Sequence, residues 1–356
     1  MFKFFKKNKK QDLLGDAHKV MKGTLKVKYD YEGYSKKNIF NSLSKNSDYG
    51  FYYWPYGYLF RHFKWGTVND LGFREKYNFN EINEVYKDFY KIGFFGGSTG
   101  FDIFVKDSDT IVSKLENKIN NDQDILNKIG KVKIINFSQC GNSILTEILN
   151  YVQFGGLVDL NLIISHGPVN DFIHMQINDP TLVKNYKISY TDVLEAWGRK
   201  IHDADDIDIE FLHADVNRPD FKPVKPKSSP DDILNTYVFR TNQFYNLVKG
   251  TGKKFISSLQ PWITSKQNLS KKELEFKDSY NPFYQQVYKN VPMLYEKFVS
   301  TYSKQLSHIP CVNIHEVFKN LSNKTDHFGD VCHLQEPGNE VSANEYFKKF
   351  KQLILG

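Results

Sequence analysis

The chain has 356 residues, of which 40% are apolar, and this is typical of a globular protein with a substantial core. The formal net charge is +7. Much of that charge comes from lysines within the first ten residues, Lys3, Lys6, Lys7, Lys9 and Lys10, so the remainder is close to neutral. Nucleic-acid binding, which needs a basic face, is therefore poorly supported.

The first ten residues, MFKFFKKNKK, mix Phe with Lys but are followed neither by a membrane-spanning apolar run nor by a signal-peptide core. We interpret residues 1–10 as a solvated tail, with weak contact to an anionic membrane surface as the alternative. The three cysteines, Cys140, Cys311 and Cys332, are odd in number and fit no metal-ligand spacing, which favours a reducing compartment. We expect a cytoplasmic protein, at most peripheral to the membrane, without a disulfide, a zinc site or another metal.

Short apolar, β-rich runs predict five buried strands at Lys91–Phe95, Val132–Phe137, Leu160–Ser165, Lys254–Leu259 and Cys311–Val317. Helical patterns alternate with them at Ile111–Ile129, Ser143–Phe154, Asp231–Lys249 and Pro282–Leu306. Ser229 with Pro230 predicts a helix N-terminus, and Gly250 the C-cap of the same helix. The alternation predicts an α/β fold of three α/β/α layers, with a five-stranded, mainly parallel sheet.

Two regions fall outside this alternation. Residues 1–85 form a predicted N-terminal extension that packs on a second domain, residues 86–356, and aromatic side chains crowd together between Tyr49 and Trp65. Such rings can stack on sugars, but they also build small cores, and we favour the structural interpretation. An insertion at about 175–230, which ends in the loop-like sequence FKPVKPKSSP, is expected to shape a pocket.

Polar and glycine residues follow three of the predicted strands. Ser98 lies in GGSTG after the first strand, where its amide opens the next helix; Gly141 follows the second, and Asn170 the third. Because ligands bind at the carboxyl ends of parallel strands, we expect these groups at one edge of the sheet. A main-chain N–H of Ser98 or Gly141 and the Asn170 amide are suitable donors to an oxyanion.

The sequence Asp330-Val331-Cys332-His333 sets a carboxylate three residues before a histidine, a spacing that lets Asp330 hold one ring nitrogen of His333. His327 also lies three residues from Asp330 and is the closest rival. We interpret Cys332 as a packing residue, since a nucleophilic thiol needs an electropositive setting. The glycine-serine turn, the strand-end glycine, the loop asparagine and the DxxH spacing are each common when they occur alone. Their order along the chain, each after a predicted strand, is what indicates a shared site.

In that order the blocks GGST, Gly141, GPVND and DVCHL resemble the SGNH/GDSL hydrolase superfamily of bacterial GDSL-like esterases. The resemblance covers about residues 91–356, and NDLGFR, with Asn69, Gly72 and Arg74, is also similar to bacterial members. Two positions depart from the pattern. Gly97 replaces the aspartate of the GDS block, and His166 stands where an acidic residue often precedes GxND, which we expect to alter the charge of the pocket.

The resemblance implies a flavodoxin-like SGNH fold and a catalytic triad of Ser98, His333 and Asp330. Ser98 N–H, Gly141 N–H and the Asn170 side chain would form the oxyanion hole, and no cofactor would be required. The expected activity is hydrolysis of a small acyl ester, in particular an O-acetyl group on a carbohydrate or another small molecule. An O-acyltransferase with the same serine, a lipid or thioester hydrolase and a non-catalytic binding protein of the same fold remain alternatives, and the oligomeric state is not predicted.

Overall fold

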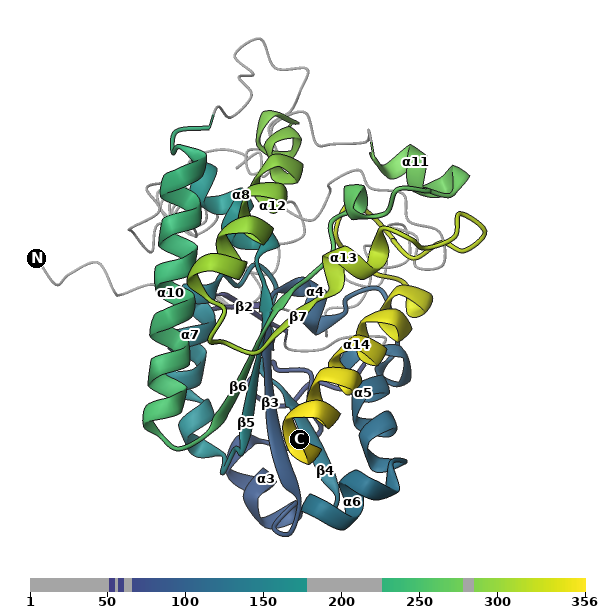
Figure 1. Cartoon of the computed structure of the whole chain (residues 1–356). Helices are drawn as coiled ribbons and strands as arrows, with labels where there is room; N and C mark the ends of the chain where they lie inside the picture. The colour runs from purple at the N-terminus through teal and green to yellow at the C-terminus, as the bar shows by residue number, and fades with distance from the viewer. Residues whose placement is uncertain (1–50, 55–56, 61–65, 178–225, 278–284) are drawn as a thin grey trace, which may run out of the picture.

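The computed structural model describes residues 51–54, 57–60, 66–177, 226–277 and 285–356 (Figure 1). The predicted tail at residues 1–10, most of the aromatic-rich segment and most of the predicted insertion lie outside these residues. Within the aromatic-rich segment, β1 (Phe51–Trp54) and β2 (Gly57–Phe60) pair as antiparallel strands.

Five parallel strands form the central sheet, which confirms the predicted fold class. The strands are β3 (Tyr90–Gly96), β4 (Val132–Asn136), β5 (Leu162–Gly167), β6 (Lys254–Leu259) and β7 (Cys311–Asn313). Their order across the sheet is β4-β3-β5-β6-β7, and every neighbouring pair is parallel. The first strand of the sheet, β3, is therefore an interior strand. β4 lies on one side of it and β5, β6 and β7 lie on the other, which creates a topological switch point between β3 and β5.

Helices cover both faces of the sheet, giving three layers (Figure 1). One layer contains α7 (Ile144–Gln153), α8 (Val169–Ile177), α10 (Pro230–Gly250) and α12 (Gln285–Gln305). The other contains α5 (Ile111–Asn120), α6 (Gln123–Ile129) and α14 (Glu336–Leu355). Because both faces are covered, strands such as β3 and β5 read as continuous apolar runs rather than as alternating patterns.

The core extends upstream of the sheet. Phe95 of β3 stacks on Phe137 with ring centroids 4.6 Å apart, and Phe79 stacks on the other side of Phe137 at 4.6 Å. Phe79 begins α3 (Phe79–Val85), and it is buried together with Phe73 and Ile82. Residues 66–85 thus share the core of the sheet, while the domain boundaries expected from the sequence remain a prediction.

Several element boundaries differ from the sequence-based ones, and three of the differences involve capping residues. The fifth strand ends at Asn313, because the Asn313 side chain accepts a hydrogen bond from Glu316 N (3.1 Å) and starts α13 (Ile314–Phe318). The helix expected over 111–129 is two helices, since Asp122 caps a new one at Ile125 N (3.1 Å). Ser229 is the N-cap of α10 as predicted, but Gly250 is its last helical residue and Thr251 its C-cap.

The predicted insertion at 175–230 leaves and rejoins the fold at one place. α8 ends at Ile177 and α10 begins at Pro230, and Lys227 N donates to Gln176 O (2.7 Å). Gln176 is buried and also donates through Nε2 to Val287 O of α12 (3.0 Å). The two flanks of the insertion are therefore anchored to the helical layer formed by α8, α10 and α12.

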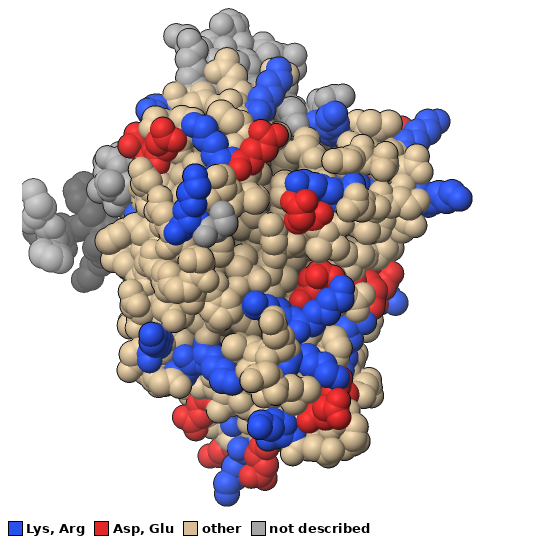
Figure 2. All heavy atoms as spheres, in the orientation of Figure 1, with Lys and Arg blue, Asp and Glu red and all other residues tan. Residues whose placement is uncertain are grey.

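Basic and acidic side chains are interspersed on the face shown in Figure 2, around wide uncharged areas. Ion pairs also join neighbouring helices. Lys114 and Lys118 of α5 pair with Glu340 of α14 at 3.2 and 2.5 Å. Of the helices that the structure describes, none combines the length and apolar character needed to cross a membrane.

Candidate active site

Ser98 stands at the carboxyl end of β3, beside the switch point between β3 and β5. β3 ends at Gly96, Gly97 has extended backbone (φ −86°, ψ −156°), and α4 (Ser98–Phe101) begins at the serine. Gly96 passes so close to its neighbours that an added Cβ would lie 3.1 Å from the His166 Cβ. Ser98 itself is only partly buried, although the residues on either side of it are buried.

Two hydrogen bonds join Ser98 to the predicted acid and base. Ser98 Oγ lies 2.7 Å from His333 Nε2, and His333 Nδ1 lies 2.5 Å from Asp330 Oδ2. The structure thus brings together the three residues that the sequence predicted as a triad, although Ser98 is far from the other two along the chain. The separations match those of a nucleophile, a base and a residue that orients the base.

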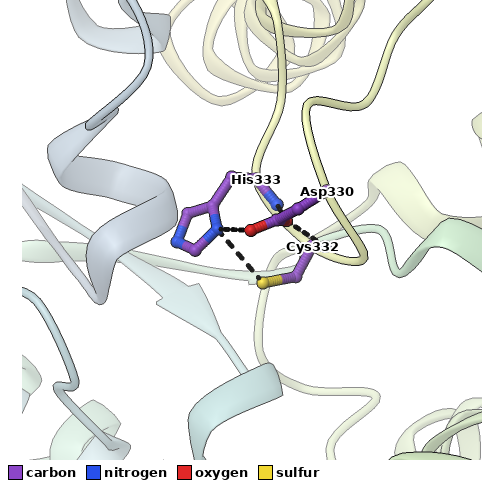
Figure 3. A group of neighbouring side chains, drawn as sticks. All are labelled: Asp330, Cys332 and His333. Atoms are coloured by element: carbon purple, nitrogen blue, oxygen red, sulfur yellow. Dashed lines mark hydrogen bonds and ion pairs between the residues drawn. The ribbon is translucent and has the colours of Figure 1, made fainter. Parts of the chain in front are cut away.

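Asp330 is held as a carboxylate (Figure 3). Its Oδ1 accepts the main-chain N–H groups of Cys332 (2.7 Å) and His333 (2.6 Å). Burial alone would raise the pKa of Asp330, but the His333 ring and these N–H groups outweigh it and lower the pKa below its ordinary value. An ionised carboxylate only accepts hydrogen bonds, so His333 Nδ1–H donates to it and Nε2 is left to accept the Ser98 hydroxyl proton.

Residues 327–335, here the His333 turn, form a small closed loop. Phe328 and Leu334 make an antiparallel bridge, Gly329 N donates to His333 O (2.8 Å) and Gln335 N donates to His327 O (2.9 Å). The Phe104 ring packs edge-on against the His333 ring, with centroids 5.1 Å apart. The imidazole is therefore fixed by backbone closure on one side and by an aromatic contact on the other.

A buried ion pair anchors the base of the His333 turn. Glu273 in α11 (Lys271–Lys277) accepts His327 N (2.7 Å) and Phe328 N (3.2 Å) through Oε1. Its Oε2 pairs with Lys266 Nζ at 2.5 Å, and both side chains are fully buried. Lys266 Nζ also donates to Thr325 O (2.8 Å). Neither residue of this pair lies in a motif or near His333 along the chain, so no sequence pattern indicated its role.

His327, the rival of His333, belongs to that anchor and does not contact Ser98. Its Nδ1 lies 3.1 Å from Lys266 Nζ. Burial, together with the Lys266 charge, lowers its pKa below the ordinary value, so the ring stays neutral. His327 and His333 both lie three residues from Asp330, but only His333, on the C-terminal side, forms a hydrogen bond with Ser98.

The Asn170 amide lies against the backbone beside Ser98. Asn170 Nδ2 donates to Asn142 O (2.8 Å), and a Cβ added to Gly97 would overlap the same Nδ2. Asp171, the next residue, accepts Ile144 N at the start of α7 (3.0 Å). Gly141 precedes Asn142 in this loop and has a positive φ of 79°, a conformation that favours glycine. The GPVND block thus fastens the loop that contains Gly141 to the edge that carries Ser98.

His166, which stands where an acidic residue often precedes GxND, adds no charge to the edge that carries Ser98. Burial lowers the pKa of His166 to about 3, so the ring is neutral. Its Nδ1 lies 2.6 Å from the Tyr346 hydroxyl of α14, with Ser258 Oγ at 3.3 Å. The side chain is part of the buried contact between the sheet and α14.

Arg74 in the NDLGFR segment fixes the chain that follows α4. Its guanidinium donates to the carbonyls of Phe101 (2.8 Å) and Val105 (2.7 Å) and pairs with Asp107 (2.8 Å). The Asn69 side chain accepts Phe73 N (3.1 Å), and Gly72 has a positive φ of 82°, so the segment is a tight turn that presents Arg74. The resemblance singled out these residues without a role, and the structure gives them a supporting one.

The triad overlaps a cluster of side chains that could hold a metal ion. Among the described residues, one group of at least three His, Cys, Asp or Glu side chains has its ligand atoms close enough together, and it consists of Asp330, Cys332 and His333. The Cys332 sulfur lies 3.5 Å from His333 Nδ1 (Figure 3). Burial, followed by the Asp330 charge, raises the pKa of the Cys332 thiol, so it remains protonated and is a poor nucleophile.

No protein-family model and no curated protein matches the chain. Solved structures similar to it include a GDSL-like lipase from Bacteroides thetaiotaomicron, with 12% identity, 78% of this chain and 97% of that chain covered, and a TM-score of 0.37. Another is an acetylxylan esterase from Geobacillus stearothermophilus, with 13% identity, 73% of this chain and 93% of that chain covered, and a TM-score of 0.38. At these identities and TM-scores the likeness carries no argument about function, which has to be argued from the site itself.

Proposed function

We propose that this protein is a serine esterase of the SGNH/GDSL type that removes a small acyl group, in particular acetyl, from a hydroxyl of a carbohydrate. The observation that carries the proposal is the continuous hydrogen-bonded chain from Ser98 Oγ through His333 to Asp330, with separations of 2.7 and 2.5 Å. A binding protein would have no need to align a hydroxyl, an imidazole and an ionised carboxylate at the ligand-binding edge of a parallel sheet.

The geometry supports acyl transfer through a covalent intermediate. His333 Nε2 takes the Ser98 proton as Oγ attacks the acyl carbon, and then passes that proton to the leaving alkoxide. Asp330 keeps the imidazole in the required tautomer and stabilises it while it is protonated. Water, activated by the same nitrogen, releases the acyl group from Ser98 in the second half of the reaction. None of these steps requires a metal or a cofactor.

The oxyanion of the tetrahedral intermediate would be bound by Ser98 N–H, Gly141 N–H and the Asn170 amide. Supporting this, Asn170 Nδ2 is held against the Gly97 backbone, next to the nucleophile, through its bond to Asn142 O. An amide nitrogen has two N–H groups, so one can bind Asn142 O while the other serves the substrate. Each such donor typically contributes about 10²–10³ in rate.

The carbohydrate part of the proposal follows from the motif resemblance and from the aromatic-rich sequence at 49–65, since aromatic faces stack on sugar rings. A substrate panel tests it directly. Acetylated xylo- and glucosaccharides are compared with p-nitrophenyl acetate and with a long-chain p-nitrophenyl ester. Faster turnover of the acetylated sugars would support the proposal, whereas a preference for the long acyl chain would favour a lipid ester and contradict it.

The central experiment measures p-nitrophenyl acetate hydrolysis by the wild type, Ser98→Ala and His333→Ala. Loss of either side chain is expected to lower kcat by about 10⁴-fold or more, because the triad acts as a unit. His308→Ala is the matched control: His308 is exposed and contacts Asn242 rather than Ser98, so its removal should leave the rate unchanged. Circular dichroism of each variant checks the fold.

A wild-type rate equal to that of Ser98→Ala would contradict the esterase proposal. A fluorophosphonate probe then distinguishes the remaining possibilities, since it labels an activated serine whatever the natural acceptor. Labelling of Ser98 without hydrolysis would favour an acyltransferase that excludes water, and no labelling would favour a non-catalytic binding protein.

A further inference from the structure

The His333 turn presents three different ligand atoms within a small volume. A carboxylate oxygen of Asp330, Cys332 Sγ and a ring nitrogen of His333 all lie within 4.8 Å of one another (Figure 3), and His333 Nδ1 contacts both Asp330 Oδ2 and Cys332 Sγ. Oxygen, sulfur and nitrogen together form a ligand set that suits zinc and other thiophilic divalent cations rather than Mg²⁺ or Ca²⁺. Proton transfer in the triad uses the oxygen and the nitrogen but has no role for the sulfur.

The separations are close to those of tetrahedral coordination. Bond lengths of about 2.3 Å to sulfur and 2.0–2.1 Å to nitrogen at a tetrahedral angle place the two ligands about 3.5 Å apart. The observed separation of Cys332 Sγ and His333 Nδ1 is 3.5 Å. Asp330 Oδ2 lies 2.5 Å from Nδ1 because the two share a proton, and it would have to withdraw by about 0.8 Å once that proton is replaced by a metal ion.

The surroundings already hold two of the ligands in place. Asp330 Oδ1 accepts two main-chain N–H groups at 2.7 and 2.6 Å, which orients Oδ2 toward the cluster. The other ring nitrogen of His333 lies 2.7 Å from Ser98 Oγ, as the second nitrogen of a metal-bound histidine requires a hydrogen-bond partner. The His333 and Asp330 side chains are 15% and 10% exposed, so the cluster lies just below the surface of the described part of the chain.

We propose that the Asp330–Cys332–His333 cluster is a binding site for a thiophilic divalent cation, Zn²⁺ or Cd²⁺, and that occupancy inhibits the enzyme. The inhibitory part rests on the proposed function, whereas the binding part does not. Coordination forms bonds from the metal to Cys332 Sγ, His333 Nδ1 and Asp330 Oδ2. The Cys332 thiol loses its proton to solvent, and the one remaining proton of the His333 ring moves from Nδ1 to Nε2. Nε2–H cannot accept the Ser98 proton, so the base is disabled while the metal is bound.

Binding is tested with Cd²⁺, whose bond to a thiolate produces an ultraviolet charge-transfer band. The band is expected in the wild type and absent in Cys332→Ala. Cys311→Ala is the matched control, because Cys311 is also a partly exposed thiol but lies in β7, outside the cluster. Ser98→Ala should keep the band, since the nucleophile is not a ligand. Absence of the band in the wild type, or a band of equal intensity in Cys332→Ala, would overturn the proposal.

Inhibition is tested by titrating Zn²⁺ into the p-nitrophenyl acetate assay, each variant being scaled to its own metal-free rate. Wild type and Cys311→Ala should be inhibited reversibly, with activity restored by a chelator. Cys332→Ala should need at least about tenfold more Zn²⁺, given that loss of an outer-shell partner alone typically costs 10–100-fold in affinity. Equal sensitivity of the two cysteine variants would refute inhibition through this cluster. An inactive wild type that still shows the Cd²⁺ band would reject the esterase and leave the metal site standing.

Discussion

The turn that carries Ser98, residues 96–100, and the His333 turn meet at one hydrogen bond, yet different parts of the fold hold them. The Ser98 turn directly follows β3, which pairs with β4 on one side and with β5 on the other. The His333 turn follows no strand; a buried ion pair and its own backbone closure hold it. One half of the site is therefore a feature of the sheet, and the other half depends on distant side chains.

This difference predicts where the site is sensitive to change. The Ser98 turn should respond to alterations of local space, since its backbone is packed against neighbouring strands and loops. The His333 turn should respond to alterations of charge and hydrogen bonding at its base, although these residues contact neither the substrate nor Ser98. Substitutions at the two places separate the two kinds of support.

Among substitutions that leave the triad side chains in place, the largest effect is expected from Glu273→Gln. The change leaves the fully buried Lys266 ammonium without its partner, which typically destabilises a protein by about 3–5 kcal/mol. It also weakens acceptance of the two N–H groups at the base of the His333 turn, so kcat should fall while KM changes little. Chemical denaturation measures the stability, and steady-state kinetics measures kcat and KM separately.

Two further variants make this a test of charge rather than of general damage. Glu345→Gln removes the acid from a surface pair with Lys348 and should have no measurable effect. The double variant Lys266→Met/Glu273→Gln removes the uncompensated charge and should recover much of the lost stability. If Glu273→Gln were as stable and active as the wild type, the ion pair would not be what anchors the turn.

Gly97→Ala probes the Ser98 turn. The added methyl group would displace Asn170 Nδ2 from the backbone, and a lost oxyanion donor costs about 10²–10³ in kcat. Asn170→Ala should give a similar loss, and the double variant should be little worse than either single one, because both act on the same donor. Gly156→Ala is the control, since its methyl group would enter open space. Additive losses in the double variant would contradict this explanation.

A smaller effect concerns pH and the layer behind the Ser98 edge. Burial raises the pKa of Glu147 from 4.5 to about 8, with the nearby Asp171 charge also raising it. Between these pH values the folded protein keeps a proton that the unfolded chain has lost, so this residue makes stability fall as pH rises from about 4.5 to about 8.

Glu147→Gln should remove that part of the slope. We expect the variant to be more stable than the wild type at pH 8 and to differ little from it below pH 4.5. Burial raises the pKa of Asp171 in the same sense, to about 7, so some slope remains. Thermal unfolding across this pH range measures both. Parallel pH profiles for the two proteins would show that Glu147 does not titrate as described.

Much of the fold could be predicted from the sequence because the signals are local. Continuous apolar runs are typical of strands covered on both faces, and four of the five predicted strands agree with the structure to within two residues at each end. The fifth, extended too far, failed at Asn313, where a capping side chain overrode a β-rich run. The break at Asp122 was missed for the same reason, since capping bonds depend on geometry that periodicity does not reveal.

The sequence by itself determined the order of the elements, the carboxyl-edge positions of Ser98 and Asn170 and the pairing of Asp330 with His333, because strand-end glycines and a three-residue spacing are local properties. Only the tertiary structure decided that the His333 ring comes within hydrogen-bond distance of Ser98, that His166 is neutral and buried, and that Lys266 and Glu273 support the His333 turn. Those outcomes depend on contacts between residues far apart in the chain, and on the burial that such contacts produce, which composition and spacing do not encode.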